Sequence, residues 1–178
     1  MASVNPPPLN FEALEAAWKQ QKKRRTGRIH LLVARLGGGL HRTMEHAELC
    51  PTRGLIGDRW ERGRKPSLGR QLTLMDHRVA KLVGSGRDRQ LSGDNVLVDL
   101  NLSEDELTVG GELILGEVRL RLTDEPHLGC KIFAQRFGPE ALKWVNWQAH
   151  RSRRLRGVNC QVLVGGVIKV GDRLVVER

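Results

Sequence analysis

The chain has 178 residues, a length typical of a single domain or of one domain with an appendage. Its hydrophobic fraction of 39% is enough for a core, which excludes wholesale disorder, and its longest apolar runs are much too short to cross a membrane. The net charge of +10 favours an anionic partner such as nucleic acid, anionic lipid or a phosphorylated small molecule, without choosing among them.

The cysteines set an expectation about location. Cys50, Cys130 and Cys160 are odd in number and widely spaced, which favours reduced thiols over a disulfide framework. No charged stretch followed by an apolar stretch opens the chain, so the sequence does not indicate export. We therefore expect a cytoplasmic protein.

The N-terminal region is predicted to be a tail followed by a helix. Residues 1–10 contain three consecutive prolines and read as an extended tail, and Asn10 is placed to cap a helix over residues 11–25. The basic end of that helix matches the helix dipole and is compatible with nucleic-acid contact, although a solvated face is the usual role of such a run. We predict residues 1–27 as a tail and basic helix, and residues 28–178 as the main domain.

From residue 28 the pattern changes to strands. Residues 28–35 alternate as a strand does, and three glycines at 37–39 end it. His41, His46 and Cys50 follow at spacings that a zinc site could use, but no fourth ligand has a suitable spacing.

Two glycines then bracket a short apolar pair in residues 54–60 (GLIGDRW). This pattern predicts a tight turn that presents Asp58 and Arg59. The alternative is a hairpin turn with a surface ion pair of little energetic value.

The rest of the chain mixes short strands and helices. We predict strands over residues 71–74, 95–100 and 113–122 and in the last twenty residues, helices over 75–83 and 139–147, and one helical turn over 103–106. A faint repeat links residues 109–117 with 164–172, and both read as similar hairpins. Two such hairpins fit a closed barrel, which has no sheet edges, although chance similarity of glycine turns is a rival explanation.

The stretch 125–133 (EPHLGCKIF) carries the clearest chemistry. Cys130 follows a glycine and precedes a helical pattern in which Phe133 and Phe137 share one face. A thiol at a helix N-terminus is favoured as thiolate, which suits metal ligation or sulfur carriage. The alternative is a buried structural cysteine that behaves as a small hydrophobe.

Five pieces in this order resemble a known family. They are residues 54–59 (GLIGDR), 69–74 (GRQLTL), 92–98 (SGDNVLV), 126–130 (PHLGC) and 155–162 (LRGVNCQV). Their order resembles the MOSC family, which is named for the C-terminal domain of molybdenum-cofactor sulfurases. The resemblance covers roughly residues 28–176.

The resemblance implies a mainly β fold with a few helices: a closed β-barrel of the MOSC or pyruvate-kinase-insert type, with the N-terminal helix outside it. It also implies that Cys130 either ligates molybdenum through sulfur or carries a persulfide. Asp58, Arg59, Arg70 and Asn95 match other characteristic pocket positions of the family.

Residue chemistry adds detail to this resemblance. The molybdenum cofactor is a pterin dithiolene with a phosphate, and arginine binds phosphate bidentately, so we expect Arg59, Arg70 and Arg156 to pair with the phosphate and the pterin. His127 is expected to raise the thiolate population or to shuttle a proton, and its alternative role is a hydrogen bond at the helix entry. Asn95 has a structural alternative, as a hydrogen bonder that holds a turn.

The chain also departs from larger family members. Residues 62–66 (RGRKP) stand where many members carry His-Gly-Gly, and a second N-terminal barrel region does not fit in this length. The pyridoxal-phosphate domain that makes persulfide in the sulfurases is absent, so we do not expect this chain alone to use pyridoxal phosphate.

We therefore hypothesise a stand-alone MOSC-domain protein that binds the molybdenum cofactor or carries sulfur on Cys130. Its expected partners are a cysteine desulfurase, a cofactor-synthesis enzyme or an electron-transfer protein, together with an anionic small molecule. One alternative is a molybdenum-dependent oxidoreductase that acts on N-hydroxylated compounds with partner proteins. Another is a basic nucleic-acid-binding or non-catalytic interaction module, against which stand the low aromatic content of 4% and the lack of a nucleic-acid motif.

Overall fold

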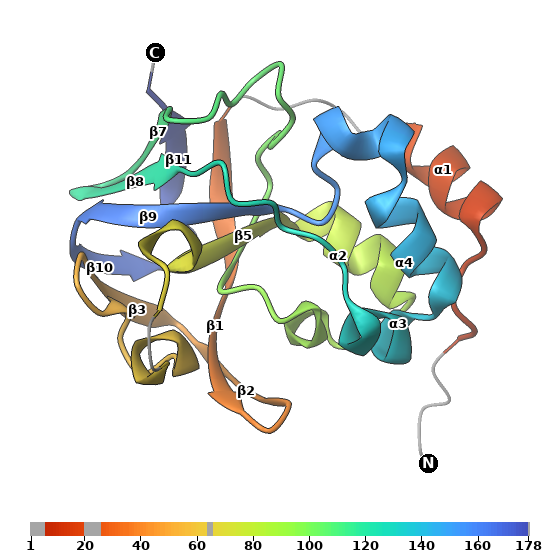
Figure 1. The fold of residues 1–178 in the computed structure, drawn as a ribbon, viewed down its shortest axis with the longest axis horizontal. Coiled ribbons are helices and arrows are strands. Elements are labelled where there is room, and N and C mark those ends of the chain that lie inside the picture. The colour runs from red at the N-terminus through yellow and green to blue at the C-terminus, as the bar shows by residue number, and fades with distance from the viewer. Residues whose placement is uncertain (1–5, 20–25, 64–65, 178) are drawn as a thin grey trace.

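A closed β-barrel forms one side of the molecule in the computed structural model, which describes residues 6–19, 26–63 and 66–177 (Figure 1). Within these residues seven strands follow one another around the barrel, and the last pairs with the first. In barrel order they are β11 (Arg173–Val176), β7 (Glu112–Leu115), β8 (Val118–Leu122), β9 (Val158–Val164), β5 (Leu72–Asp76), β6 (Val96–Val98) and β1 (Thr26–Gly37). The predicted closed barrel is confirmed.

The barrel follows from alternation and close approach. In β8 the apolar residues Val118, Leu120 and Leu122 are buried, whereas the arginines between them face solvent. Gly157 precedes β9 with φ +103°, and a Cβ there would lie 2.1 Å from the carbonyl oxygen of Leu74 in β5. Only glycine therefore lets β9 enter the barrel beside β5.

A smaller sheet lies against the barrel and corrects one prediction. It consists of β10 (Gly166–Lys169), β3 (His46–Cys50) and β4 (Gly54–Leu55). The remaining strand, β2 (Leu40–Met44), pairs antiparallel with β1. The hairpin expected over residues 109–117 is confirmed as β7 and β8. The prediction of a matching hairpin over residues 164–172 is wrong, because β10 pairs with β3 whereas β11 pairs with β1 and β7.

The turn between β10 and β11 explains this difference. The amide of Val170 donates to the carbonyl of Glu45, and that of Gly171 donates to the carbonyl of Ile29, at 2.9 and 2.8 Å. Neighbouring strands thus hold the turn while the chain passes from one sheet to the other.

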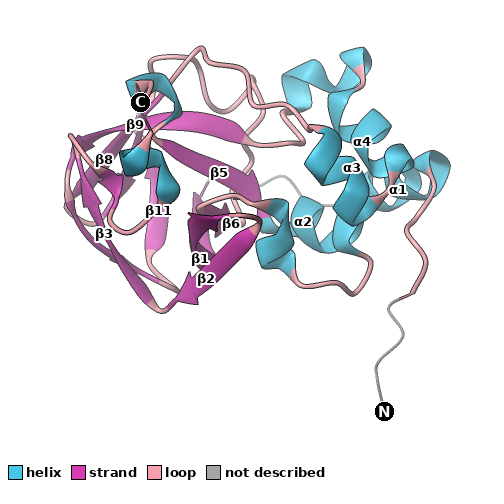
Figure 2. Cartoon of the chain, turned by 60° about the horizontal axis from the view of Figure 1, so that its bottom comes forward, coloured by secondary structure: helices cyan, strands magenta, loops and turns pink. Residues whose placement is uncertain are grey.

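The helices gather on one side of the barrel (Figures 1 and 2). They are α1 (Phe11–Lys19), α2 (His77–Gly84), α3 (Lys131–Phe137) and α4 (Pro139–Asn146), with short 3₁₀ turns between them. Their apolar faces form a second core cluster, which includes the fully buried Leu14, Phe137 and Trp144. The helices therefore have a core of their own beside that of the barrel.

The helix boundaries refine the sequence predictions. Asn10 caps α1 as predicted, since its side chain accepts from the amide of Ala13 at 2.9 Å, but residues 20–25 of the predicted helix lie outside the described residues. The helix predicted from residue 75 begins at His77, because Asp76 caps it and Met75 belongs to β5. In the described part of the chain, no helix has both the length and the apolar character needed to span a membrane.

Candidate functional site

Cys130 is exposed at the start of α3, where it occupies the N-cap position. Its backbone is extended, and its side chain makes no capping hydrogen bond. The segment before it is held by Asn146 at the end of α4. That side-chain amide accepts from the amide of Gly129 at 2.8 Å and donates to its carbonyl at 2.9 Å. The thiol is therefore presented by a fixed turn.

The other two cysteines are placed differently. Cys160 lies in β9 with no exposed surface, and burial raises the pKa of its thiol to about 12. Cys50 is half-buried at the end of β3, and its contact with the Thr52 hydroxyl at 3.3 Å lowers the pKa of its thiol. The expectation of a buried, structural cysteine applies to Cys160 and not to Cys130.

A buried ionic group lies next to the turn that presents Cys130. Asp94 has no exposed surface and accepts hydrogen bonds from His127 Nε2 and Arg156 Nη1, both at 2.7 Å. Arg156 also donates to the carbonyl of Ser92 at 3.1 Å. Its guanidinium carbon lies 5.0 Å from the ring centre of Phe133, one turn after Cys130 in α3.

These contacts determine the charge states of the group. Although burial alone would raise the pKa of Asp94, the charges of Arg156 and His127 hold it at about 2. Burial, and then the charge of Arg156, lower the pKa of His127 against the opposing effect of Asp94. Near neutral pH Asp94 is therefore a carboxylate that lies between the charged Arg156 and a neutral His127.

A group of basic side chains surrounds His41 at the start of β2. Burial and then the charges of Arg136, Arg59 and Arg35 lower the pKa of His41, and Asp58 opposes them only in part. Gly93 lies against this basic group: a Cβ at that position would be 3.7 Å from Arg136 Nη1 and 3.9 Å from His41 Nε2. Positive charge is thus concentrated beside the motif 92–98.

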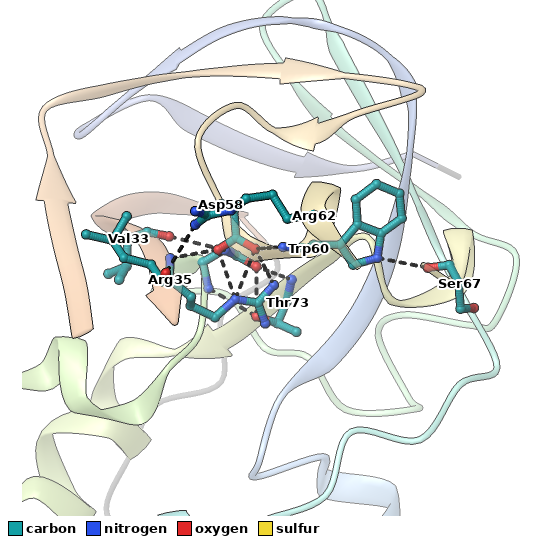
Figure 3. A network of polar contacts seen from close by, with 9 residues as sticks. Val33, Arg35, Asp58, Trp60, Arg62, Ser67 and Thr73 are labelled. Atoms are coloured by element: carbon teal, nitrogen blue, oxygen red, sulfur yellow. Dashed lines mark hydrogen bonds and ion pairs between the residues drawn. The ribbon is translucent and has the colours of Figure 1, made fainter. Parts of the chain in front are cut away.

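Asp58 lies with Arg35 and Thr73 in a network of polar contacts (Figure 3). Asn95 belongs to the same network through its bond to Asp58. Asp58 accepts from the guanidinium of Arg35 at 2.8 and 2.9 Å and from the amide of Trp60 at 2.9 Å. Asn95 donates to Asp58 at 2.9 Å and accepts from the amide and hydroxyl of Thr73 at 3.1 Å. The lone pairs of Asp58 are therefore used within the protein, and Asn95 links Asp58 to Thr73 of β5.

The remaining predicted site residues lie apart. Arg59 is exposed beside His41, whereas Arg70 is exposed and paired with Glu125 at 2.8 Å. Arg156 is buried against Asp94. The three arginines expected to pair with the phosphate and the pterin thus occupy three different environments. Among the described residues, no set of three or more His, Cys, Asp or Glu side chains is arranged to hold a metal ion, and this includes His41, His46 and Cys50.

Sequence reasoning missed several members of the site. Asp94 lies inside a recognised motif but was not singled out, Asn146, Arg35 and Arg136 were given no role, and His41 was considered only as a zinc ligand. The sequence did offer a signal for Asp94, because it stands next to a stretch that reads as a buried strand. A buried carboxylate requires a partner, so a buried cation could have been expected near it.

The sequence matches the MOSC domain family over residues 77–175. Solved structures with the same fold include the YuaD protein from Bacillus subtilis, at 18% identity and TM-score 0.57, which covers 85% of this chain and 96% of that one. YiiM from Geobacillus stearothermophilus matches at 16% identity and TM-score 0.61, with coverage of 85% and 75%. YiiM from Escherichia coli matches at 16% and 0.55, with coverage of 85% and 70%. A search of curated proteins gives no match.

Proposed function

The chain belongs to the MOSC domain family, and on this premise we propose that it binds the molybdenum cofactor or carries sulfur as a persulfide on Cys130. Members of the family are associated with sulfur chemistry related to that cofactor. The observation that carries the proposal is the exposed thiol of Cys130 at a helix start, on a turn that Asn146 fixes. A soft sulfur in that position suits both roles.

The chain's residues fit the cofactor. Cys130 would hold the metal through sulfur, and Arg59 and Arg136 would bind the phosphate, because their charges already crowd His41 and an anion would relieve that repulsion. When bound, the cofactor supplies a metal centre for redox or sulfur chemistry. The protein's part is to fix the thiol through Asn146 and to supply positive charge.

In the sulfur-carrier form, the co-reactant is a persulfide on a partner such as a cysteine desulfurase. The thiolate of Cys130 attacks the terminal sulfur of that persulfide, a new S–S bond forms on Cys130, and the partner leaves as a thiolate. A cofactor-synthesis enzyme is the matching acceptor. No pyridoxal phosphate is needed on this chain, because the partner generates the persulfide.

The test is molybdenum analysis and intact-protein mass measurement on the full chain from a host that makes the cofactor. Wild type is compared with Cys130→Ser, and Cys50→Ser is the matched control because Cys50 is also partly accessible. We expect molybdenum in about a 1:1 ratio, or a mass increase of one sulfur, in wild type and in Cys50→Ser but not in Cys130→Ser.

Either positive result identifies the cargo. Molybdenum means a cofactor-binding protein, and a mass increase of about 32 Da that a thiol reductant removes means a persulfide, since a sulfinic acid has the same nominal mass but resists reduction. Wild-type protein with a bare thiol and no metal, after incubation with a desulfurase and cysteine, would contradict both forms of the proposal.

A further inference from the structure

A cavity of about 450 Å³ lies between the end of the barrel and the helices. One wall is the segment that leads from β8 to Cys130 and includes His127 and Leu128. The facing wall is the end of α4 and the residues after it, including Val145 and Trp147. Cys130 does not line the cavity. Its volume is in the range of sites that bind small organic molecules.

The mouth of the cavity exposes apolar side chains. Leu128 is 60% exposed and Trp147 is 45% exposed, and both line the cavity. An exposed indole beside an exposed leucine is a surface that a flat apolar ring would cover. The main body of a suitable ligand is therefore apolar and ring-shaped.

The charges around the cavity balance. Arg151, Arg154 and Arg156 line it together with the carboxylates of Glu104 and Asp124. Arg154 pairs with Glu104 at 3.8 Å. A third carboxylate, Glu125, is paired with Arg70. A rim without a dominant sign favours an uncharged ligand over an anion.

His127 supplies a hydrogen-bond acceptor. Its Nε2 is engaged by Asp94 at 2.7 Å, so the ring is held with Nδ1 directed away from that carboxylate. Of the residues that the structure describes, none hydrogen-bonds to Nδ1. The lowered pKa of His127 supports a neutral ring whose proton lies on Nε2, which leaves a lone pair on Nδ1.

We propose that this cavity binds an uncharged aromatic compound with one O–H or N–H donor, of the phenol or azole class, and that the donor binds His127 Nδ1. Asp94 acts as a positioning residue, because it holds the imidazole through Nε2 and does not line the cavity, and Arg156 holds Asp94. The inference goes beyond the proposed function, since the cavity does not include Cys130.

The test compares two probes by calorimetry on the full chain. 2-Naphthol has a hydroxyl donor, and 2-methoxynaphthalene has the same rings without one. We expect both to bind at one site, with 2-naphthol tighter by about 3- to 10-fold, the ratio that one hydrogen bond gives. His127→Phe should still bind both probes but reduce that ratio to about 1.

Further variants locate the site. Trp147→Ala should lower the affinity for both probes several-fold. Val167→Ala shortens an exposed apolar side chain on β10, away from the cavity lining, and should change neither affinity. Cys130→Ser should bind both probes as wild type does while losing molybdenum or persulfide, so failure of one proposal is distinct from failure of the other.

Three results would overturn the proposal. They are no binding of either probe to wild type, equal affinities for the two probes, or binding that Trp147→Ala leaves unchanged. Where His127→Phe does not fold, the comparison of probes on wild type still decides whether the ligand's donor is bound, and equal affinities there overturn the role given to His127.

Discussion

At the scale of single residues, position decides what each ionisable side chain can do. Cys130 and Cys160 have the same chemistry, but the first is exposed at a helix start and the second has its thiol pKa raised to about 12 by burial. His77, outside the site, is another residue whose surroundings shift its pKa. Its ring stacks on that of His30 with centroids 3.8 Å apart, and Arg89 Nη1 lies 3.4 Å from its Nδ1.

The stacked histidines predict a pH dependence of stability. Burial, and then the charges of His30 and Arg89, lower the pKa of His77 from 6.5 to about 4, against the effect of Asp99 and with a further small effect of Arg78. Between these values the unfolded chain binds the proton and the folded chain does not. Stability from this residue is therefore full above pH 6.5 and is lost as the pH falls towards 4.

Urea unfolding from about pH 7 to about pH 4 checks this prediction. In His77→Gln the free energy of unfolding should fall less steeply across that range than in wild type. His46→Gln, at an exposed position in β3, is the control and should keep the wild-type slope. Equal slopes for wild type and His77→Gln would contradict the assigned pKa shift.

At the scale of elements, α3 and α4 act as one unit that presents Cys130. Phe133 and Phe137 pack together with ring centroids 4.8 Å apart, and both are buried, as the spacing predicted. Asn146 then ties the end of α4 to the residue before Cys130. A change in α4 should therefore affect the thiol although the two are far apart in sequence.

Removal of the Asn146 side chain tests this coupling. Asn146→Ala loses two hydrogen bonds to Gly129, so we expect the free energy of unfolding to fall by about 1–2 kcal/mol. The rate of Cys130 alkylation in a Cys50→Ser background should change, because the turn loosens. Gln148→Ala, an exposed neighbour, should alter neither quantity. An unchanged alkylation rate in a destabilised Asn146→Ala would show that the turn is held by other contacts.

At the scale of the whole molecule, one buried carboxylate joins parts that are distant in sequence. Asp58 precedes a 3₁₀ turn and binds Arg35 of β1 and Asn95 beside β6, and Asn95 in turn binds Thr73 of β5. The charge of Arg35 keeps the pKa of Asp58 below its ordinary value, although burial acts in the opposite direction. The motif 54–59 is therefore important to the barrel itself.

Asp58→Ala should destabilise the protein strongly. It leaves the guanidinium of Arg35 without its buried partner, which typically costs about 3–5 kcal/mol. Thermal or urea unfolding measures the loss, and Glu117→Ala, at an exposed turn, is the control and should stay within about 0.5 kcal/mol of wild type. A loss below about 1 kcal/mol would contradict this structural role of Asp58.

Much of the fold could be predicted from local patterns. Alternating burial in β8 and the helix start at Cys130 depend on neighbours within a few residues, so sequence periodicity reveals them. The order of five motifs identified the family, which the match over residues 77–175 supports. The pairing of β10 and β11 was not predictable in the same way, because their partners lie far away in the chain.

The sequence by itself determined the strand pattern of the barrel, the helix start at Cys130 and the family, while the exposure of Cys130 came from the structure. Only the tertiary structure decided that Asp94, His127 and Arg156 form one buried group, that Asp58 and Asn95 support the barrel wall, and that a cavity opens beside His127. The physical reason is that periodicity reports which side of an element is buried. The partner of a buried charge is set by which distant segments the fold brings within hydrogen-bond distance.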